Sequence, residues 1–173
     1  IPFGIAEGKQ EQVYEAMQTK RKVEDRENKI YLSWNDYTYD RYELRKKMTD
    51  WQAYSKPDSL TVRGPGENQD SYEDYLDNLS KHKYVISPPG NGQDCYRTLE
   101  SVYMGCYTFV QDTPTNYLTN LPVLRYQNID DIISMYSYNK GAGPEMSEGF
   151  EERPEIKLSH WKELIHSKRN EVF

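Results

Sequence analysis

The stretch KYVISPPGNGQDCYRTLE, residues 83–100, decides the expected fold of this chain. Residues 83–87 form a compact apolar run that is typical of a buried strand, and the Pro-Pro-Gly-Asn-Gly sequence that follows it predicts a loop. From residue 93 to residue 105, Leu99 and Val102 fall on one face of a helix. A strand, a glycine loop and a helix in this order predict part of a βαβ unit with parallel strands.

The same alternation of short strands and amphipathic helices continues on both sides of this stretch. Residues 140–154 are rich in Gly, Pro and Glu and predict a surface loop. The pattern predicts an α/β fold, a Rossmann-like doubly wound parallel sheet, in a single domain over residues 1–173, with residues 1–6 as the end of an interdomain linker. Strands are expected at residues 29–34, 59–64, 107–110 and 122–126, and helices at residues 7–26, 36–54, 70–81, 129–138 and in the closing segment 155–173.

Composition and charge narrow the class of protein. Hydrophobic residues make up 36% of the 173 residues, and the 16 tyrosines add large rings that can be buried while their hydroxyls stay in water. The net charge of -6 argues against a nucleic-acid partner, which needs a basic face. No apolar run reaches the length of a membrane span, and the first residues lack the features of a signal peptide. With two cysteines and no disulfide framework, we expect a cytoplasmic chain.

The loop and helix start in this stretch have the features of an anion-binding site. Gly90 and Gly92 allow a ligand to approach the main chain closely. The N-terminus of the next helix offers N–H groups and a partial positive charge, which suit a phosphate or diphosphate. We expect Asp94 to cap this helix, Arg97 to pair with a phosphate oxygen, and Glu100 to accept both hydroxyls of a ribose.

A plainer interpretation also fits these residues. Pro-Gly-Asn-Gly turns are common between a strand and a helix, and Arg97 and Glu100 have the spacing of an ordinary surface ion pair. The glycine spacing differs from both the dinucleotide fingerprint and the P-loop. No Lys-Ser or Lys-Thr pair follows the glycines, which argues against hydrolysis of a nucleoside triphosphate.

Residues 83–114, KYVISPPGNGQDCYRTLESVYMGCYTFVQDTP, resemble the donor-domain signature of exostosin-like glycosyltransferases, S-P-x-G-N-G-x-D-x-H-R-T-x-E-x-x-x-x-G-C-x-P-I-V. The chain departs from this signature at Tyr96, where His is usual, and over residues 107–109, where a small residue, Pro and Ile are usual. Three further segments are similar to the family: IPFGI at residues 1–5, LPVLRYQNIDDI at residues 121–132 and KLSHWKELI at residues 157–165. The matching signature residues are Ser87, Pro88, Gly90, Asn91, Gly92, Asp94, Arg97, Thr98, Glu100, Gly105, Cys106 and Val110.

The resemblance implies that the chain is the C-terminal half of a GT-B glycosyltransferase and binds a nucleotide-diphosphate sugar. It also implies a glycan or other hydroxyl acceptor, and an N-terminal acceptor domain or partner chain that supplies the base. In this interpretation Arg97 and Glu100 are the catalytic residues. The substrate-binding candidates are Ser87, Gly90, Asn91, Gly92, Asp94, Thr98, Arg41 and Thr113.

Glycosyl transfer places negative charge on the leaving diphosphate, which a metal ion or fixed dipoles and cations must stabilise. The sequence contains no Asp-x-Asp, and its three histidines have no neighbours at ligand spacing. We therefore expect neither a metal nor another cofactor, and we assign the stabilising role to the helix start at residues 92–94 and to Arg97.

Several other polar residues suit either a ligand-binding role or a structural one. Arg41 is a candidate for a second cation, and a solvated helix charge explains it equally well. Arg63 is a weaker candidate of the same kind. Ser87 and Thr113 fall at strand ends, where they suit either donor binding or turn formation. His82, between two lysines, is expected to be an exposed loop residue rather than a catalytic base.

Two functions remain open at this level. One is the donor half of an enzyme, and the other is a non-catalytic nucleotide-sugar-binding module that completes a partner chain. A flavodoxin-like signalling domain is disfavoured, because acidic residues do not cluster at the ends of the first expected strands.

Overall fold

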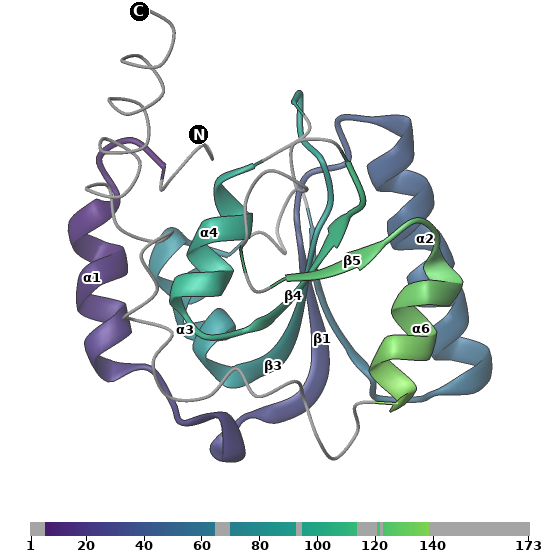
Figure 1. The fold of residues 1–173 in the computed structure, drawn as a ribbon, viewed down its shortest axis with the longest axis horizontal. Coiled ribbons are helices and arrows are strands. Elements are labelled where there is room, and N and C mark those ends of the chain that lie inside the picture. The colour runs from purple at the N-terminus through teal and green to yellow at the C-terminus, as the bar shows by residue number, and fades with distance from the viewer. Residues whose placement is uncertain (1–5, 65–69, 93–94, 114–120, 122, 139–173) are drawn as a thin grey trace, which may run out of the picture.

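The computed structural model describes residues 6–64, 70–92, 95–113, 121 and 123–138, and it confirms the expected Rossmann-like α/β fold. Five parallel strands form one sheet in the order β2-β1-β3-β4-β5, with helices on both faces (Figure 1). The elements are α1 (Gln10–Thr19), a 3₁₀ turn (Val23–Asp25), β1 (Glu27–Ser33), α2 (Tyr39–Ser55), β2 (Leu60–Arg63), α3 (Tyr72–Lys81), β3 (His82–Ser87), α4 (Tyr96–Tyr103), β4 (Tyr107–Gln111), β5 (Val123–Tyr126) and α6 (Ile129–Tyr138).

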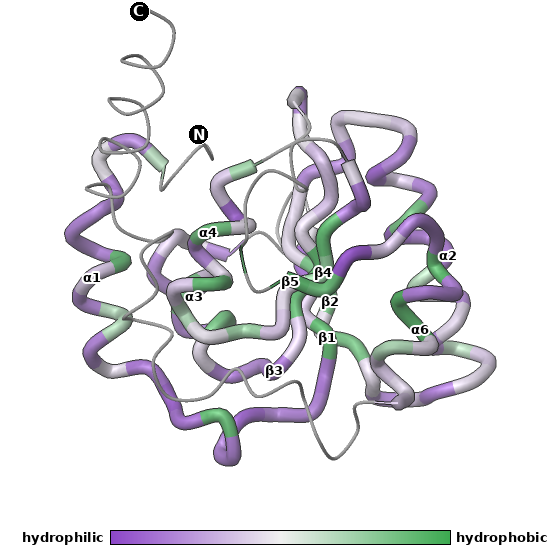
Figure 2. The backbone as a smooth tube through the Cα atoms, in the orientation of Figure 1, coloured by the Kyte–Doolittle hydropathy of each residue, from purple (hydrophilic) through white to green (hydrophobic). Residues whose placement is uncertain are grey.

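The sheet is buried on both faces. Successive side chains of each strand point to opposite sides, and each side packs into a hydrophobic core. In β1, Ile30 and Leu32 pack with Met48 of α2 in one core, whereas Tyr31 packs with Leu79 of α3 in the other. Figure 1 shows α2 and α6 on one side of the sheet and α1, α3 and α4 on the other. Hydropathy follows this arrangement, since much of the hydrophobic colour lies along the strands (Figure 2).

The chain order creates a topological switch point between β1 and β3. From β1 the chain runs through α2 to β2 at one edge, and α3 then carries it back past β1 to β3. Ile30 of β1 accordingly pairs with Leu60 on one side and with Tyr84 on the other. In open parallel sheets, ligands bind at the carboxyl ends of the strands beside such a point.

Several helices begin where short polar side chains cap them. The hydroxyl of Thr38 accepts from the amide of Arg41 at the start of α2, and Ser71 accepts from the amide of Asp74 at the start of α3. The first helix is shorter than expected, ending at Thr19 before a separate 3₁₀ turn.

The expectation of an exposed loop at His82 is wrong. His82 is the first residue of β3, and only 2% of its surface is exposed. Its ring stacks on Tyr31 with centroids 5.1 Å apart, and its two nitrogens lie 2.7 Å from the Asn78 carbonyl and 2.7 Å from the Thr61 hydroxyl. Lys81 and Lys83 beside it gave the impression of a solvated loop, but strand alternation turns the imidazole inward.

A buried arginine holds the turn between α4 and β4. The guanidinium of Arg26 donates to the carbonyls of Arg21, Met104 and Gly105. Gly105 has a φ of 76°, a conformation that other residues rarely adopt. The glycine at position 105 therefore has a structural reason in this turn, whatever the chain binds.

Residues 1–5 of the expected linker end (residues 1–6), the loop at residues 140–154 and the closing helix in residues 155–173 lie outside the described residues.

Candidate functional site

A pocket of ≈ 420 Å³ opens at the carboxyl edge of the sheet, next to the switch point. This volume is within the range of small-molecule sites. Its walls come from the end of β1, the segment after β2, the start of α3 and the start of α4. It is lined by three arginines (Arg41, Arg63 and Arg97), two carboxylates (Asp70 and Glu100) and three tyrosines (Tyr72, Tyr75 and Tyr96), among other residues.

The glycine loop after β3 is less open than the sequence suggests. The amide of Gly90 donates to the carbonyl of Gly92 at 3.0 Å, so this N–H is already used within the loop. Arg41 also lies against Gly90, where a Cβ atom would come within 3.2 Å of its Nη2. A side chain at position 90 would therefore crowd this guanidinium. Asn91 and Gly92 are exposed to solvent.

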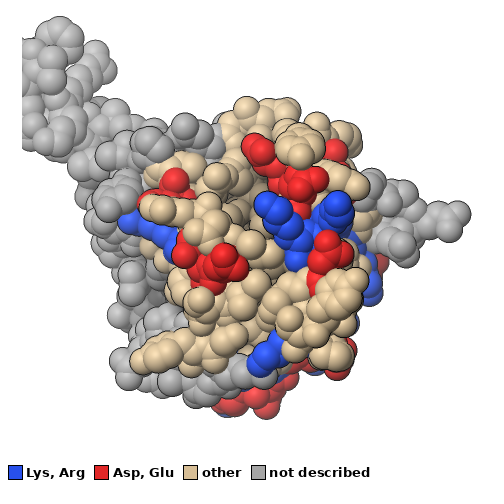
Figure 3. All heavy atoms as spheres, turned by 90° about the vertical axis from the view of Figure 1, so that its right-hand side faces the viewer, with Lys and Arg blue, Asp and Glu red and all other residues tan. Residues whose placement is uncertain are grey.

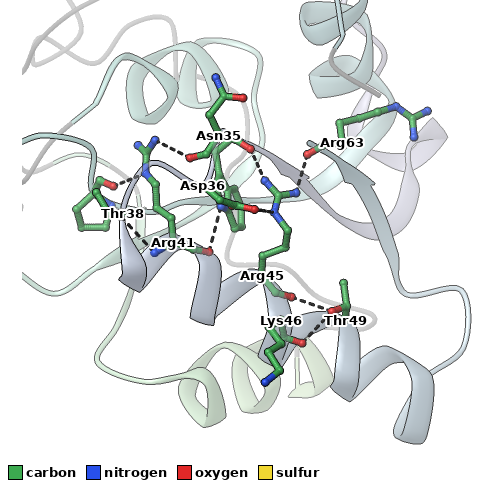
Figure 4. A network of polar contacts seen from close by, with 10 residues as sticks. Asn35, Asp36, Thr38, Arg41, Arg45, Lys46, Thr49 and Arg63 are labelled. Carbon is green, nitrogen blue, oxygen red and sulfur yellow. Dashed lines mark hydrogen bonds and ion pairs between the residues drawn. The ribbon is translucent and has the colours of Figure 1, made fainter. Parts of the chain in front are cut away.

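Arg41 links this loop to the end of β1. Its Nε donates to the Pro89 carbonyl at 2.6 Å, and its Nη1 donates to the Asn35 carbonyl at 3.4 Å (Figure 4). The interpretation of Arg41 as a solvated helix charge is therefore wrong. Arg41 and Arg97 line the same pocket, and burial, followed by the charge of Arg97, lowers the pKa of the Arg41 guanidinium.

Arg97 enters the pocket from the second residue of α4. Its Nε is buried and has no hydrogen-bond partner among the described residues, and its Nη1 contacts the Cys95 sulfur at 3.9 Å. A buried N–H without an acceptor is costly and needs an explanation. Two guanidinium groups with spare donors at one pocket form a site that suits an anion with several oxygens.

The Glu100 carboxylate is buried, with 3% of the residue exposed, although it lines the pocket. Its Oε1 accepts from the Tyr72 hydroxyl at 2.9 Å, and its Oε2 accepts from the Tyr75 hydroxyl at 3.1 Å. Burial and the Glu100 charge raise the pKa of both tyrosines, so both hydroxyls stay protonated donors. The alternative of a surface ion pair between Arg97 and Glu100 is therefore wrong.

The wall at the start of α3 carries a second polar group that the sequence analysis did not single out. Asp70 accepts from the Tyr31 hydroxyl, from Asn78 at 3.0 Å and from Nε of Arg63 at 3.2 Å. The ion pair holds Arg63 at the rim of the pocket, where its side chain is 42% exposed. The only sequence signal for Asp70 was its place just before a helix, in a stretch of mixed polar residues.

A neighbouring arginine on α2 has a structural role. Nε of Arg45 pairs with Asp36 at 3.0 Å, and its other nitrogens donate to the Trp34 and Arg63 carbonyls (Figure 4). Its guanidinium also lies over the Trp34 ring, 4.8 Å from the centroid. Arg45 thus covers the Trp34 ring, so this face of the ring is not open to a ligand.

Other predicted ligand contacts are placed elsewhere. The hydroxyls of Ser87 and Thr98 lie 3.0 Å apart, both residues are buried, and Ser87 also contacts the Cys95 sulfur at 3.1 Å. Their polar groups therefore join the end of β3 to α4. Thr113 follows β4 and is partly buried, outside the lining of this pocket. Asp94 lies outside the described residues.

A second pocket of ≈ 320 Å³ lies across Arg41 from the first, between the start of α2, residues 88–90 and the ends of β4 and β5. Arg41 lines both pockets. The side of the molecule formed by α2 and α6 carries acidic side chains close to basic ones (Figure 3).

The described residues form neither a metal-binding cluster nor a membrane-spanning helix, and the chain matches no family model. Within the described ranges, no group of three or more His, Cys, Asp or Glu side chains is arranged to hold a metal ion. No helix in the described part of the chain is both long enough and apolar enough to cross a bilayer. No protein-family model matches the chain, and no curated protein matches it with significance.

Proposed function

We propose that this chain is the donor-binding domain of a cytoplasmic, metal-independent glycosyltransferase, the C-terminal half of a GT-B enzyme of exostosin-like type. The observation that carries the proposal is the meeting of Arg41 and Arg97 at one pocket beside the switch point, with the Glu100 carboxylate in the same wall. Two cations and a carboxylate at one pocket suit the two phosphates and the ribose of a nucleoside diphosphate.

In the proposed reaction, the bond between the anomeric carbon and the diphosphate oxygen breaks, and negative charge grows on the leaving group. Arg97 and Arg41 stabilise this charge as fixed cations, and the first amides of α4 add the positive end of a helix dipole. Glu100 orients the nucleotide through the ribose hydroxyls. Because Arg41 is held by two carbonyls, it needs little reorganisation when the diphosphate binds.

The base that deprotonates the acceptor is proposed to come from an acceptor domain or a partner chain. Both described carboxylates of the pocket are engaged, Asp70 with Arg63 and Tyr31, and Glu100 with two tyrosines. The same observation favours the alternative of a non-catalytic module that binds a nucleotide sugar for a partner. An assay for slow hydrolysis of a bound UDP-sugar or GDP-sugar separates the two, because only the enzyme is expected to break the sugar–phosphate bond.

Titration calorimetry of the chain with UDP, GDP and their sugars tests the proposal. We expect saturable binding of one of them, weakened by about 10- to 100-fold in Arg97→Ala, since a charge-assisted hydrogen bond contributes about 1.5–3 kcal/mol. Tyr54→Phe, at an 89% exposed position of α2, is the matched control and should bind as the wild type does. The absence of binding for every nucleotide, or equal binding by Arg97→Ala, refutes the proposal.

A further inference from the structure

The carboxylate of Glu100 is shared between two tyrosines that differ in their surroundings. Tyr75 belongs to the core on the α3 side of the sheet and has 9% of its surface exposed. Tyr72 is only partly buried against that core and has the ammonium of Lys9 4.8 Å from its ring centroid, although both tyrosines line the pocket. The Tyr72 hydroxyl can therefore turn towards water, whereas the Tyr75 hydroxyl is held inside the protein.

The two carboxylate oxygens also differ in their remaining capacity. Each carboxylate oxygen can accept about two hydrogen bonds. Oε1 accepts from Tyr72 at 2.9 Å and from the Ala6 amide at 3.4 Å, while the described contact of Oε2 is with Tyr75 at 3.1 Å. A vicinal diol donates one hydrogen bond to each oxygen of a carboxylate. Oε2 can accept a hydrogen bond from one hydroxyl of the diol in addition to that from Tyr75. Oε1 must release one of its two partners before it can accept from the other hydroxyl.

We propose that the Tyr72 hydroxyl is a placeholder, which leaves Oε1 of Glu100 when a ribose hydroxyl binds there. This inference rests on the proposed function, since it names the part of the ligand that Glu100 recognises. Tyr72 then competes with the ligand and sets how strongly the site prefers a nucleotide with an intact ribose. Tyr75 keeps its bond to Oε2 and acts as a positioning residue for the carboxylate.

The test is calorimetry of the full chain with UDP and GDP and with their 2′,3′-dideoxy counterparts. For Tyr72→Phe we expect the ribonucleotide to bind about 3- to 10-fold more tightly, in the range of the net contribution of one intramolecular hydrogen bond, because its competitor is gone. The dideoxy compound has no hydroxyl to place on Oε1, so its affinity should stay within about twofold. Tyr14→Phe, at a 64% exposed position of α1, is the control and should change neither affinity.

Two further measurements keep the inference open to refutation. In a Glu100→Gln background the gain from Tyr72→Phe should disappear, because the charged acceptor is gone. In the wild type labelled at the tyrosine ring carbon that bears the hydroxyl, the Tyr72 NMR signal should move on adding the ribonucleotide and not the dideoxy compound. This second measurement does not depend on the folding of any variant.

The outcomes distinguish failure of the proposed function from failure of the proposed displacement of Tyr72. If the wild type binds neither UDP nor GDP, the proposed function fails and the placeholder fails with it. If the wild type binds and Arg97→Ala does not, but Tyr72→Phe binds the ribonucleotide no better, or gains equally for the dideoxy compound, the placeholder alone is refuted.

Discussion

Replacing Arg97 with methionine should leave the stability of the fold intact and remove the function. In the free chain, Nε of Arg97 is buried without a partner, and the neighbouring Arg41 cation repels its charge. A buried unpaired N–H costs about 1–3 kcal/mol, and Met keeps most of the packing of the aliphatic stem. The free energy of unfolding is therefore expected to stay within about 1 kcal/mol of the wild type, or to rise.

Arg45→Met is the matched comparison, because it makes the same substitution at an arginine of α2. Arg45 pairs with both oxygens of Asp36, donates to two carbonyls and covers Trp34, and its side chain is only 13% exposed. Its removal also leaves the half-buried Asp36 carboxylate unpaired. We expect a loss of about 2–4 kcal/mol in the free energy of unfolding.

Urea unfolding followed by circular dichroism measures both variants, with the slope of the transition as the check that the two-state analysis holds. Nucleotide affinity is measured on the same samples. The reasoning predicts a stable Arg97→Met that has lost affinity by about 10- to 100-fold, and an unstable Arg45→Met that keeps affinity at low temperature. A loss of stability in Arg97→Met as large as that in Arg45→Met would refute the view that Arg97 is held ready for a ligand.

Three further changes test individual features. Burial lowers the pKa of His82 below its usual value of 6.5. The native chain therefore takes up fewer protons than the unfolded chain, and its stability falls as the pH drops below 6.5. In urea unfolding between pH 7 and pH 5, the free energy of unfolding of His82→Gln should fall less than that of the wild type. Gly105→Ala should cost about 1–2 kcal/mol in the same assay, because φ is 76° there, and an unchanged midpoint contradicts this. Gly90→Ala should displace the Arg41 guanidinium, because Nη2 would lie 3.2 Å from the new Cβ. We expect nucleotide affinity to fall by about 3- to 10-fold and the free energy of unfolding to change by less than about 1 kcal/mol. Wild-type affinity in calorimetry would contradict this prediction.

The layout of the fold could be predicted from the sequence because it depends on local periodicity. The apolar run before Ser87 and the helical spacing of Leu99 and Val102 indicate a strand and a helix without knowledge of any distant residue. The strand–loop–helix order also placed Arg97 and Glu100 near the carboxyl edge of the sheet. In the structure both residues line one pocket.

The partners of these residues could not be predicted, because they depend on contacts between distant elements. Tyr72 and Tyr75 have helical spacing in α3, which indicates a packing stripe, and nothing local shows that both hydroxyls reach Glu100 across 28 and 25 positions of sequence. Asp70 was missed for the same reason, since it precedes α3 and its partner Tyr31 lies on β1, 39 positions earlier in the sequence. Periodicity tells which face of an element is buried, and it does not tell which polar tips meet.

A crystal structure of the chain with bound UDP or GDP tests the central claim most directly. We predict electron density for the diphosphate in the pocket at the end of β1, with its oxygens within hydrogen-bond distance of the guanidinium groups of Arg41 and Arg97. A nucleotide bound elsewhere, or a diphosphate in this pocket with Arg97 turned out to solvent, would contradict the account.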